Sequence, residues 1–104
     1  MNTLEQLGYA PDDRVLIIHV DDVGFSRASN VAAFEGMTSG SLTCGSALVP
    51  APWFMETVAL QKQHPEADLG VHMTLTAEYE TYRWPALTGR LGGTSLHEIG
   101  RAHV

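Results

Sequence analysis

Short apolar runs alternate with helical patterns along most of the chain. Three runs, at about 14–20, 42–49 and 68–75, are rich in small or β-branched apolar residues, which is typical of strands in a parallel sheet. The segments between them, about 31–40 and 52–64, space their apolar residues at helical intervals. This alternation of strand and helix with short connections predicts an α/β fold of parallel β-α-β-α-β units with right-handed crossovers.

Turn and cap residues predict where these elements end. Ser29 or Asn30 is expected to cap the first of the two helices, and Gly40 is expected to close it. Pro65 should stop the second helix, since proline cannot continue a helical hydrogen-bond pattern. After Leu75 the sequence is rich in aromatic residues, Gly and Thr and lacks a helical period, so a long loop over the strand ends is expected.

Two adjacent acids, Asp21 and Asp22, follow the first apolar run. Uncompensated carboxylates at the end of a buried strand are costly, so they need a cation, hydrogen-bond donors or open water. A solvated turn that caps a helix is one interpretation, and a metal or catalytic site is the other. His72 favours the second, because it lies late in the third strand and parallel strands end at the same rim. His19 should share a side with Asp21 and is expected to pack or support rather than to bind a metal.

Composition limits the classes of function. The 104 residues, 44% hydrophobic and 17% charged, are typical of one small globular domain rather than of a disordered chain. A net charge of −6 with scattered basic residues argues against nucleic acid as a partner. The single cysteine, Cys44, cannot form an internal disulfide, and no apolar run approaches the roughly 20 residues of a membrane span. We therefore predict a cytoplasmic protein without a membrane segment.

The number of strands raises the question of how the sheet is completed. Three strands cannot close a barrel and would leave exposed edges, so we expect either a homo-oligomer or an incomplete chain. The segment 98–104, EIGRAHV, is what the beginning of a common DNA-sequencing adaptor encodes in one reading frame. We predict that 1–97 is the N-terminal portion of a single domain and that 98–104 is a non-native tail. The alternative is that EIGRAHV is a natural C-terminus.

Three segments together resemble the YdjC-like carbohydrate deacetylases, which include chitooligosaccharide deacetylases. They are IIHVDDVGFSRASN, ALVPAPWF and HPEADLGVHMTLTAEYETYRW, and the likeness extends over about 15–96. The resemblance implies a (β/α) barrel-like, TIM-barrel-like fold and metal-dependent removal of acetyl groups from N-acetylated sugars or oligosaccharides. It also implies that Asp22 and His72 bind a divalent metal ion, Mg²⁺ or Zn²⁺, and that Asp21 is the catalytic base.

The family is also expected to supply a further histidine ligand from a later strand, beyond the last residue of this chain. We therefore expect the 104-residue chain by itself to be inactive. Tyr79, Tyr82 and Trp84 could stack on a sugar ring or pack in the core. Two rival interpretations are a Mg²⁺-binding phospho-receiver domain, which expects an aspartate where this chain has His72, and a non-catalytic structural domain.

Overall fold

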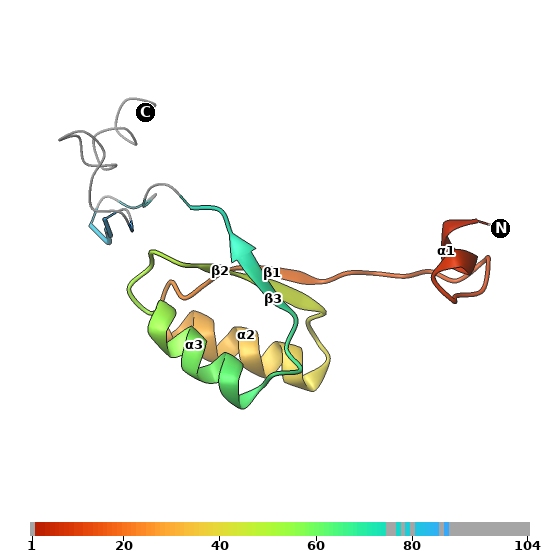
Figure 1. The fold of residues 1–104 in the computed structure, drawn as a ribbon, viewed down its shortest axis with the longest axis horizontal. Coiled ribbons are helices and arrows are strands. Elements are labelled where there is room, and N and C mark those ends of the chain that lie inside the picture. Colours follow the sequence, from red (N-terminus) through yellow and green to blue (C-terminus); the bar gives the residue numbers. More distant parts are fainter. Residues whose placement is uncertain (1, 75–76, 78, 80, 86, 88–104) are drawn as a thin grey trace, which may run out of the picture.

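The computed structural model describes residues 2–74, 77, 79, 81–85 and 87. Its centre is a parallel sheet with the strand order β1-β2-β3, and helices α2 and α3 lie together on one face of that sheet (Figure 1). The α/β class and the parallel pairing are thus confirmed. Within the described residues no helix is both long and apolar enough to cross a bilayer. The elements are α1 (Thr3–Gln6), β1 (His19–Val23), α2 (Arg27–Ser39), β2 (Cys44–Leu48), α3 (Phe54–Gln63) and β3 (Leu69–His72).

The main hydrophobic core lies between the sheet and the two helices. Val23 and Ala47 are buried against Phe34 of α2, and Val20 and Leu69 pack at the margin of this cluster. Because alternate residues of a strand point to opposite faces, the residues between these apolar ones belong to the other face of the sheet. The side chains on that helix-free face are therefore largely polar and include His19, Asp21, Ser46 and His72.

A β-bulge in β1 keeps both acids out of the hydrophobic core. Val20 pairs with Gly45 and Val23 pairs with Ala47, so β1 has one more residue than β2 between these pairs. In a regular strand Asp22 would share the inward face of Val20. With the bulge, Val23 takes that inward position instead, and the acids remain half-buried or exposed.

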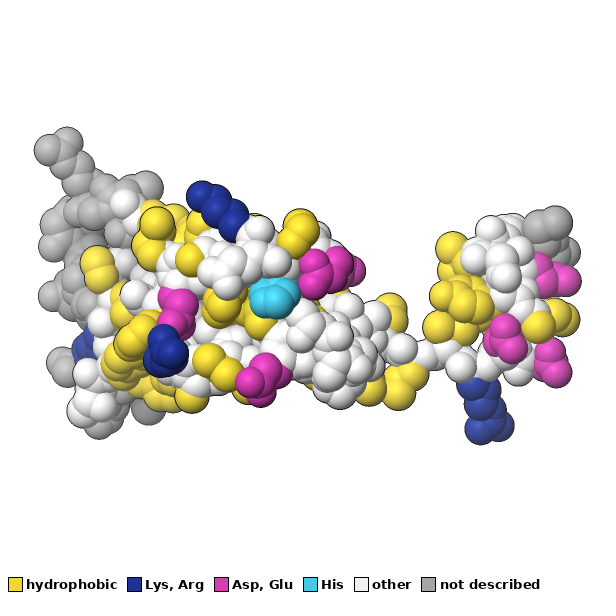
Figure 2. Space-filling view, turned by 90° about the horizontal axis from the view of Figure 1, so that it is seen from below, with side chains coloured by type: hydrophobic (Ala, Val, Ile, Leu, Met, Phe, Trp, Pro, Cys, Tyr) yellow, Lys and Arg dark blue, Asp and Glu magenta, His cyan; other side chains and the backbone are white. Residues whose placement is uncertain are grey.

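The first strand begins later than the pattern predicted. Residues 14–18 are extended and exposed, with Leu16 at 75% exposure, although their composition predicted a buried strand. The reason is the register: β2 begins at Cys44, opposite His19, so the preceding residues run past the end of β2. Ile18 still accepts a hydrogen bond from the Thr43 N–H, at 2.8 Å. Beyond this segment α1 stands apart from the sheet, joined to it by a narrow neck (Figures 1 and 2).

The C-terminal ends of α2 and α3 agree with the prediction, whereas the N-cap of α2 differs from it. Gly40 ends α2 in a left-handed conformation with φ 81°, and α3 stops at Gln63, two residues before Pro65. The predicted cap of α2 was wrong, because Ser26 is the N-cap and exchanges hydrogen bonds with Ser29 in a capping box. Asn30 is instead completely buried in the first turn.

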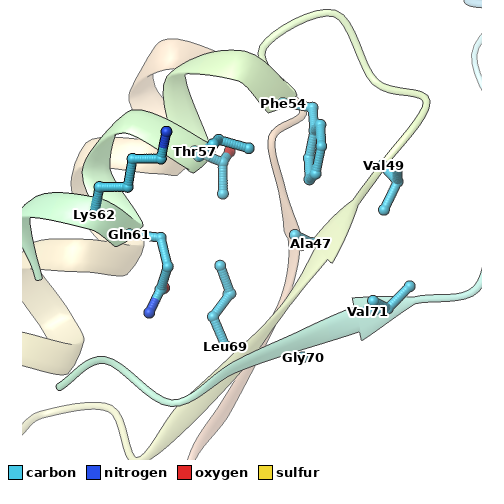
Figure 3. A pocket seen from close by; sticks show the side chains of 10 residues that line it. Ala47, Val49, Phe54, Thr57, Gln61, Lys62, Leu69, Gly70 and Val71 are labelled. Carbon is cyan, nitrogen blue, oxygen red and sulfur yellow. The ribbon is translucent and has the colours of Figure 1, made fainter. Parts of the chain in front are cut away.

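The helix-covered side also has an apolar pocket of about 370 Å³ between α3 and the edge strand β3 (Figure 3). Among the described residues that line it, Lys62 is the one ionisable group and none is a His, Cys, Asp or Glu that could bind a metal. The acids and histidines of β1 and β3 lie on the other face of the sheet. The pocket is lined by Ala47, Val49, Phe54, Thr57, Val58, Gln61, Lys62, Leu69, Gly70 and Val71.

Candidate active site

The structure brings Asp21, Asp22 and His72 together at the carboxyl ends of β1 and β3. His72 Nε2 lies 3.5 Å from Asp22 Oδ1 and 3.8 Å from Asp21 Oδ1. β2 separates the two strands, so the imidazole and the carboxylates meet across the middle strand of the sheet. Three residues predicted from separate parts of the sequence therefore form one cluster.

Backbone conformation and a buried hydrogen bond fix the loop from Asp22 to Gly24. Asp22 has φ 62°, a left-handed conformation that aspartate tolerates better than most residues, and Gly24 has φ 97°. A Cβ on Gly24 would also lie 3.3 Å from the Leu48 carbonyl oxygen. The Gly24 N–H donates to Asn30 Oδ1 at 2.7 Å, so a buried side chain of α2 fixes the loop that carries the acids. These constraints place the Asp22 carboxylate at the rim of the sheet.

Asp21 is held by hydrogen bonds on the helix-free face. The Ser46 hydroxyl donates to Asp21 Oδ1 at 2.8 Å, and His19 Nε2 lies 3.1 Å from the same oxygen. The Ser46 hydrogen bond is the main reason that the pKa of Asp21 lies below its ordinary value. Desolvation, the second-largest effect, raises this pKa, and His72 and then His19 lower it. Asp21 is therefore ionised at neutral pH and can accept a proton.

Ser46 and Cys44 were not predicted from the sequence to lie at the site. The Ser46 side chain lies between Asp21 and His19, whose Nε2 is 3.1 Å from Ser46 Oγ, and Cys44 Sγ is 3.1 Å from His19 Nδ1. The expectation that His19 shares a side with Asp21 is confirmed. Period-two spacing places Cys44 and Ser46 on one face of β2, and this signal could have pointed to them, but only the strand register shows which residues of β1 they face.

The donor atoms of Asp22 and His72 fit a shared divalent ion. Oxygen and nitrogen ligands about 2.0–2.2 Å from a tetrahedral Zn²⁺ lie about 3.4 Å apart, close to the 3.5 Å found here. His72 Nδ1 lies 3.4 Å from the Met73 carbonyl oxygen, a contact that leaves Nε2 free to bind a metal. Among the described residues no group of three or more His, Cys, Asp or Glu side chains is arranged to hold a metal ion. The described part of the chain thus offers two ligands of such a site.

The three aromatic residues predicted to stack on a sugar differ in accessibility. Tyr79 is 44% exposed and lies against Phe25 with the ring centroids 4.9 Å apart. The Tyr82 hydroxyl donates to the Phe25 carbonyl oxygen at 2.8 Å. Trp84 is only 5% exposed and packs with Leu48 in a second small core, so its ring has no open face for a sugar. Of the two roles that the sequence left open for Trp84, its burial favours core packing.

Comparisons with known proteins identify a family and several relatives. A family model described as YdjC-like protein matches residues 15–101, which includes four residues of the segment 98–104; the non-native origin of that segment stays a prediction. A chitooligosaccharide deacetylase of Klebsiella pneumoniae (strain 342) is 35% identical over 82 residues, 77% of this chain and 32% of that protein. A carbohydrate deacetylase of Thermus thermophilus is 38% identical over 88 residues, 85% of this chain and 29% of that protein.

A third relative, a carbohydrate deacetylase of Brevibacillus brevis, is 34% identical over 61 residues, 59% of this chain and 25% of that protein. The chain thus spans a third or less of the length of these curated relatives. The matched region contains the bulged strand with the acid pair and the strand that ends on His72. The extent of the family match shows that the chain belongs to the YdjC-like family of proteins.

Proposed function

We propose that this chain carries the opening part of the active site of a metal-dependent carbohydrate deacetylase that acts on N-acetylated sugars or oligosaccharides. The observation that carries the proposal is the cluster of Asp21, Asp22 and His72 at the carboxyl end of the sheet, in a chain of the YdjC-like family. Sites in folds built from βα units are found at this end of the strands. The relatives named as carbohydrate deacetylases suggest the class of substrate.

Asp22 and His72 would hold a divalent ion, Zn²⁺ or Mg²⁺, together with a further ligand from the rest of the active site. Zn²⁺ accepts both imidazole and carboxylate ligands, whereas Mg²⁺ prefers oxygen, so the histidine favours Zn²⁺. When bound, such an ion polarises the acetamide carbonyl and lowers the pKa of a water molecule. These two ligands by themselves would bind the ion weakly, since a catalytic zinc site has three protein ligands.

Asp21 would act as the general base of amide hydrolysis. The Ser46 hydroxyl donates to Oδ1 of the ionised carboxylate, and the carboxylate would take a proton from the attacking water. Acetate and a free amine would be the products. Tyr79, exposed beside the rim, and the half-buried Tyr82 are the aromatic residues that could contact the sugar.

The sheet order weakens the phospho-receiver alternative. A flavodoxin-like receiver places its first strand between the second and third, whereas β2 is the central strand here. His72 also stands where the receiver would need an aspartate. Binding of Zn²⁺ through Asp22 and His72 would in turn argue against a purely structural domain.

Substitution of the two acids in the whole deacetylase tests the proposal. Asp21→Asn should keep the metal but lower deacetylation by about 10² to 10⁴-fold, the usual effect of losing a general base. Asp22→Asn should lose the metal as well. Zinc content by mass spectrometry of purified protein and acetate release from N-acetylated chito-oligosaccharides measure the two effects. Asp12→Asn, in an exposed turn, is the matched control. If Asp21→Asn released the metal and Asp22→Asn did not, the two roles would be reversed.

A further inference from the structure

Three side chains form a line that ends on Asp21 across β1 and β2. Cys44 Sγ is 3.1 Å from His19 Nδ1, His19 Nε2 is 3.1 Å from Ser46 Oγ, and Ser46 Oγ is 2.8 Å from Asp21 Oδ1. His19 Nε2 is also 3.1 Å from Asp21 Oδ1. His19 therefore contacts Oδ1 of Asp21 directly and also through the Ser46 hydroxyl.

The positions of the hydrogens follow from these partners. The Ser46 hydroxyl donates to Asp21, so the other contact of Ser46 Oγ is as an acceptor. Both neighbours of His19 Nε2 then accept, and Nε2 must carry the hydrogen. In the neutral ring His19 Nδ1 is left as the acceptor, and the thiol of Cys44 is its donor. Every donor in the line thus points toward Asp21.

We infer that Cys44, His19 and Ser46 are positioning residues that hold Oδ1 of Asp21 and present Oδ2 to the attacking water. This inference rests on the proposed function, in which Asp21 is the base. Among the described residues, no hydrogen bond to Asp21 Oδ2 is found. A carboxylate held at one oxygen cannot rotate freely, so the other oxygen keeps one direction toward the substrate.

The tautomer of His19 gives a readout that does not depend on activity. In ¹⁵N NMR spectra of the 104-residue chain above the imidazole titration range, His19 should show the Nε2–H tautomer. His64 is an internal control, because its Nδ1 lies 3.3 Å from Glu66 Oε1 and should carry the hydrogen instead. Cys44→Ala should raise the Nδ1–H population of His19, and Cys44→Ser should restore Nε2–H. A His19 ring in the Nδ1–H form would overturn the inference.

Kinetics of the zinc-loaded whole deacetylase test the positioning itself. Ser46→Ala should lower kcat about tenfold with KM and zinc content unchanged, since the proposed role of the hydroxyl acts through Asp21. Ser46→Thr keeps the hydroxyl and should recover most of kcat. His19→Gln retains a donor near the Nε2 position and should lose less activity than His19→Ala. Ser41→Ala, at an exposed site between α2 and β2, is the matched control for the loss of a hydroxyl.

The two proposals fail in different ways. If Asp21→Asn retained full activity, the proposed base and with it the positioning role would be wrong. If Asp21→Asn lost activity while Ser46→Ala and His19→Ala kept the parental kcat, the base would stand and the positioning inference would be overturned. A Ser46→Ala variant with a lower thermal midpoint but an unchanged kcat would assign Ser46 a structural role alone, which also contradicts the inference.

Discussion

Two neighbouring residues of the same type, Asp21 and Asp22, have different surroundings because the backbone between them changes direction. Asp21 lies on the helix-free face with a serine and a histidine beside its carboxylate. Asp22 has the left-handed backbone of the bulge, and its carboxylate faces His72. This difference gives each acid its own proposed task, proton transfer for Asp21 and metal binding for Asp22.

At the residue scale, Ser46→Ala should raise the pKa of Asp21 toward its ordinary value of 3.8, because the hydroxyl is the largest cause of the lowering. A ¹³C NMR titration of the side-chain carboxyl in the metal-free chain measures this change, with Ser41→Ala as the control. An unchanged pKa in Ser46→Ala would show that another group keeps the carboxylate ionised.

The sign of the effect on stability follows from linkage. A carboxyl whose pKa is lower in the folded than in the unfolded state stabilises the fold fully above its ordinary pKa, and this contribution is lost as the pH falls through the lowered value. Ser46→Ala should therefore reduce the fall in stability below pH 3.8 that is due to Asp21. The free energy of unfolding in urea, measured at a series of acidic pH values for both proteins, tests this expectation.

At the scale of elements, Asn30 connects α2, α3 and the loop that carries the acids. Its Oδ1 accepts from the Gly24 N–H and from the Thr57 hydroxyl at 3.0 Å, and its Nδ2 donates to Glu56 Oε2 at 2.9 Å. The side chain is fully buried and has donors and acceptors on both ends satisfied. One residue thus couples the packing of two helices to the position of the Asp22 carboxylate.

Asn30→Ala should lower the free energy of unfolding by about 2–4 kcal/mol, because it leaves the Gly24 N–H buried without an acceptor and removes the hydrogen bonds to Thr57 and Glu56. Urea denaturation followed by circular dichroism measures the change. Asn2→Ala is the control: Asn2 caps α1, which stands apart from the sheet, so the main transition should move by about 0.5 kcal/mol or less. Equal losses in the two variants would contradict the proposed coupling.

The sequence predicts the end of an element correctly where a single residue of that element sets it. The prediction fails where a neighbouring strand sets it. Gly40 and Pro65 end their helices by backbone geometry alone, so both ends could be predicted. The limits of β1 depend on where β2 begins, and the apolar run that starts at Val15 carries no information on that register. Asp21, Asp22 and His72 could be brought together from the sequence because parallel strands end at one rim. Contacts that depend on the strand register, such as that of Ser46 with Asp21, could not be predicted from the sequence. The burial of Trp84 could not be predicted either.

At the scale of the whole molecule, the sheet order and the placement of the helices decide which face is available for chemistry. Consecutive strands are neighbours, and both helices cover one face, so the other face is free to hold polar groups near the strand ends (Figure 1). The apolar pocket beside α3 lies on the covered side, and neither Asp21 nor Asp22 is among the residues that line it (Figure 3). Substitutions of the residues that line this pocket should lower the free energy of unfolding more than they lower catalytic activity.

The exposed segment Val15–Ile18 has a consequence for the behaviour of the protein at high concentration. Four consecutive large apolar residues in an extended backbone, 45–75% exposed, form a template on which a strand of another molecule can add. The 104-residue chain should therefore aggregate with a strong dependence on concentration. Leu16→Lys should delay the rise in light scattering and in thioflavin T fluorescence, since a charge on the edge opposes strand addition. Leu7→Lys makes the same change on α1 and should have little effect, so an equal delay would show that the position of the lysine does not matter.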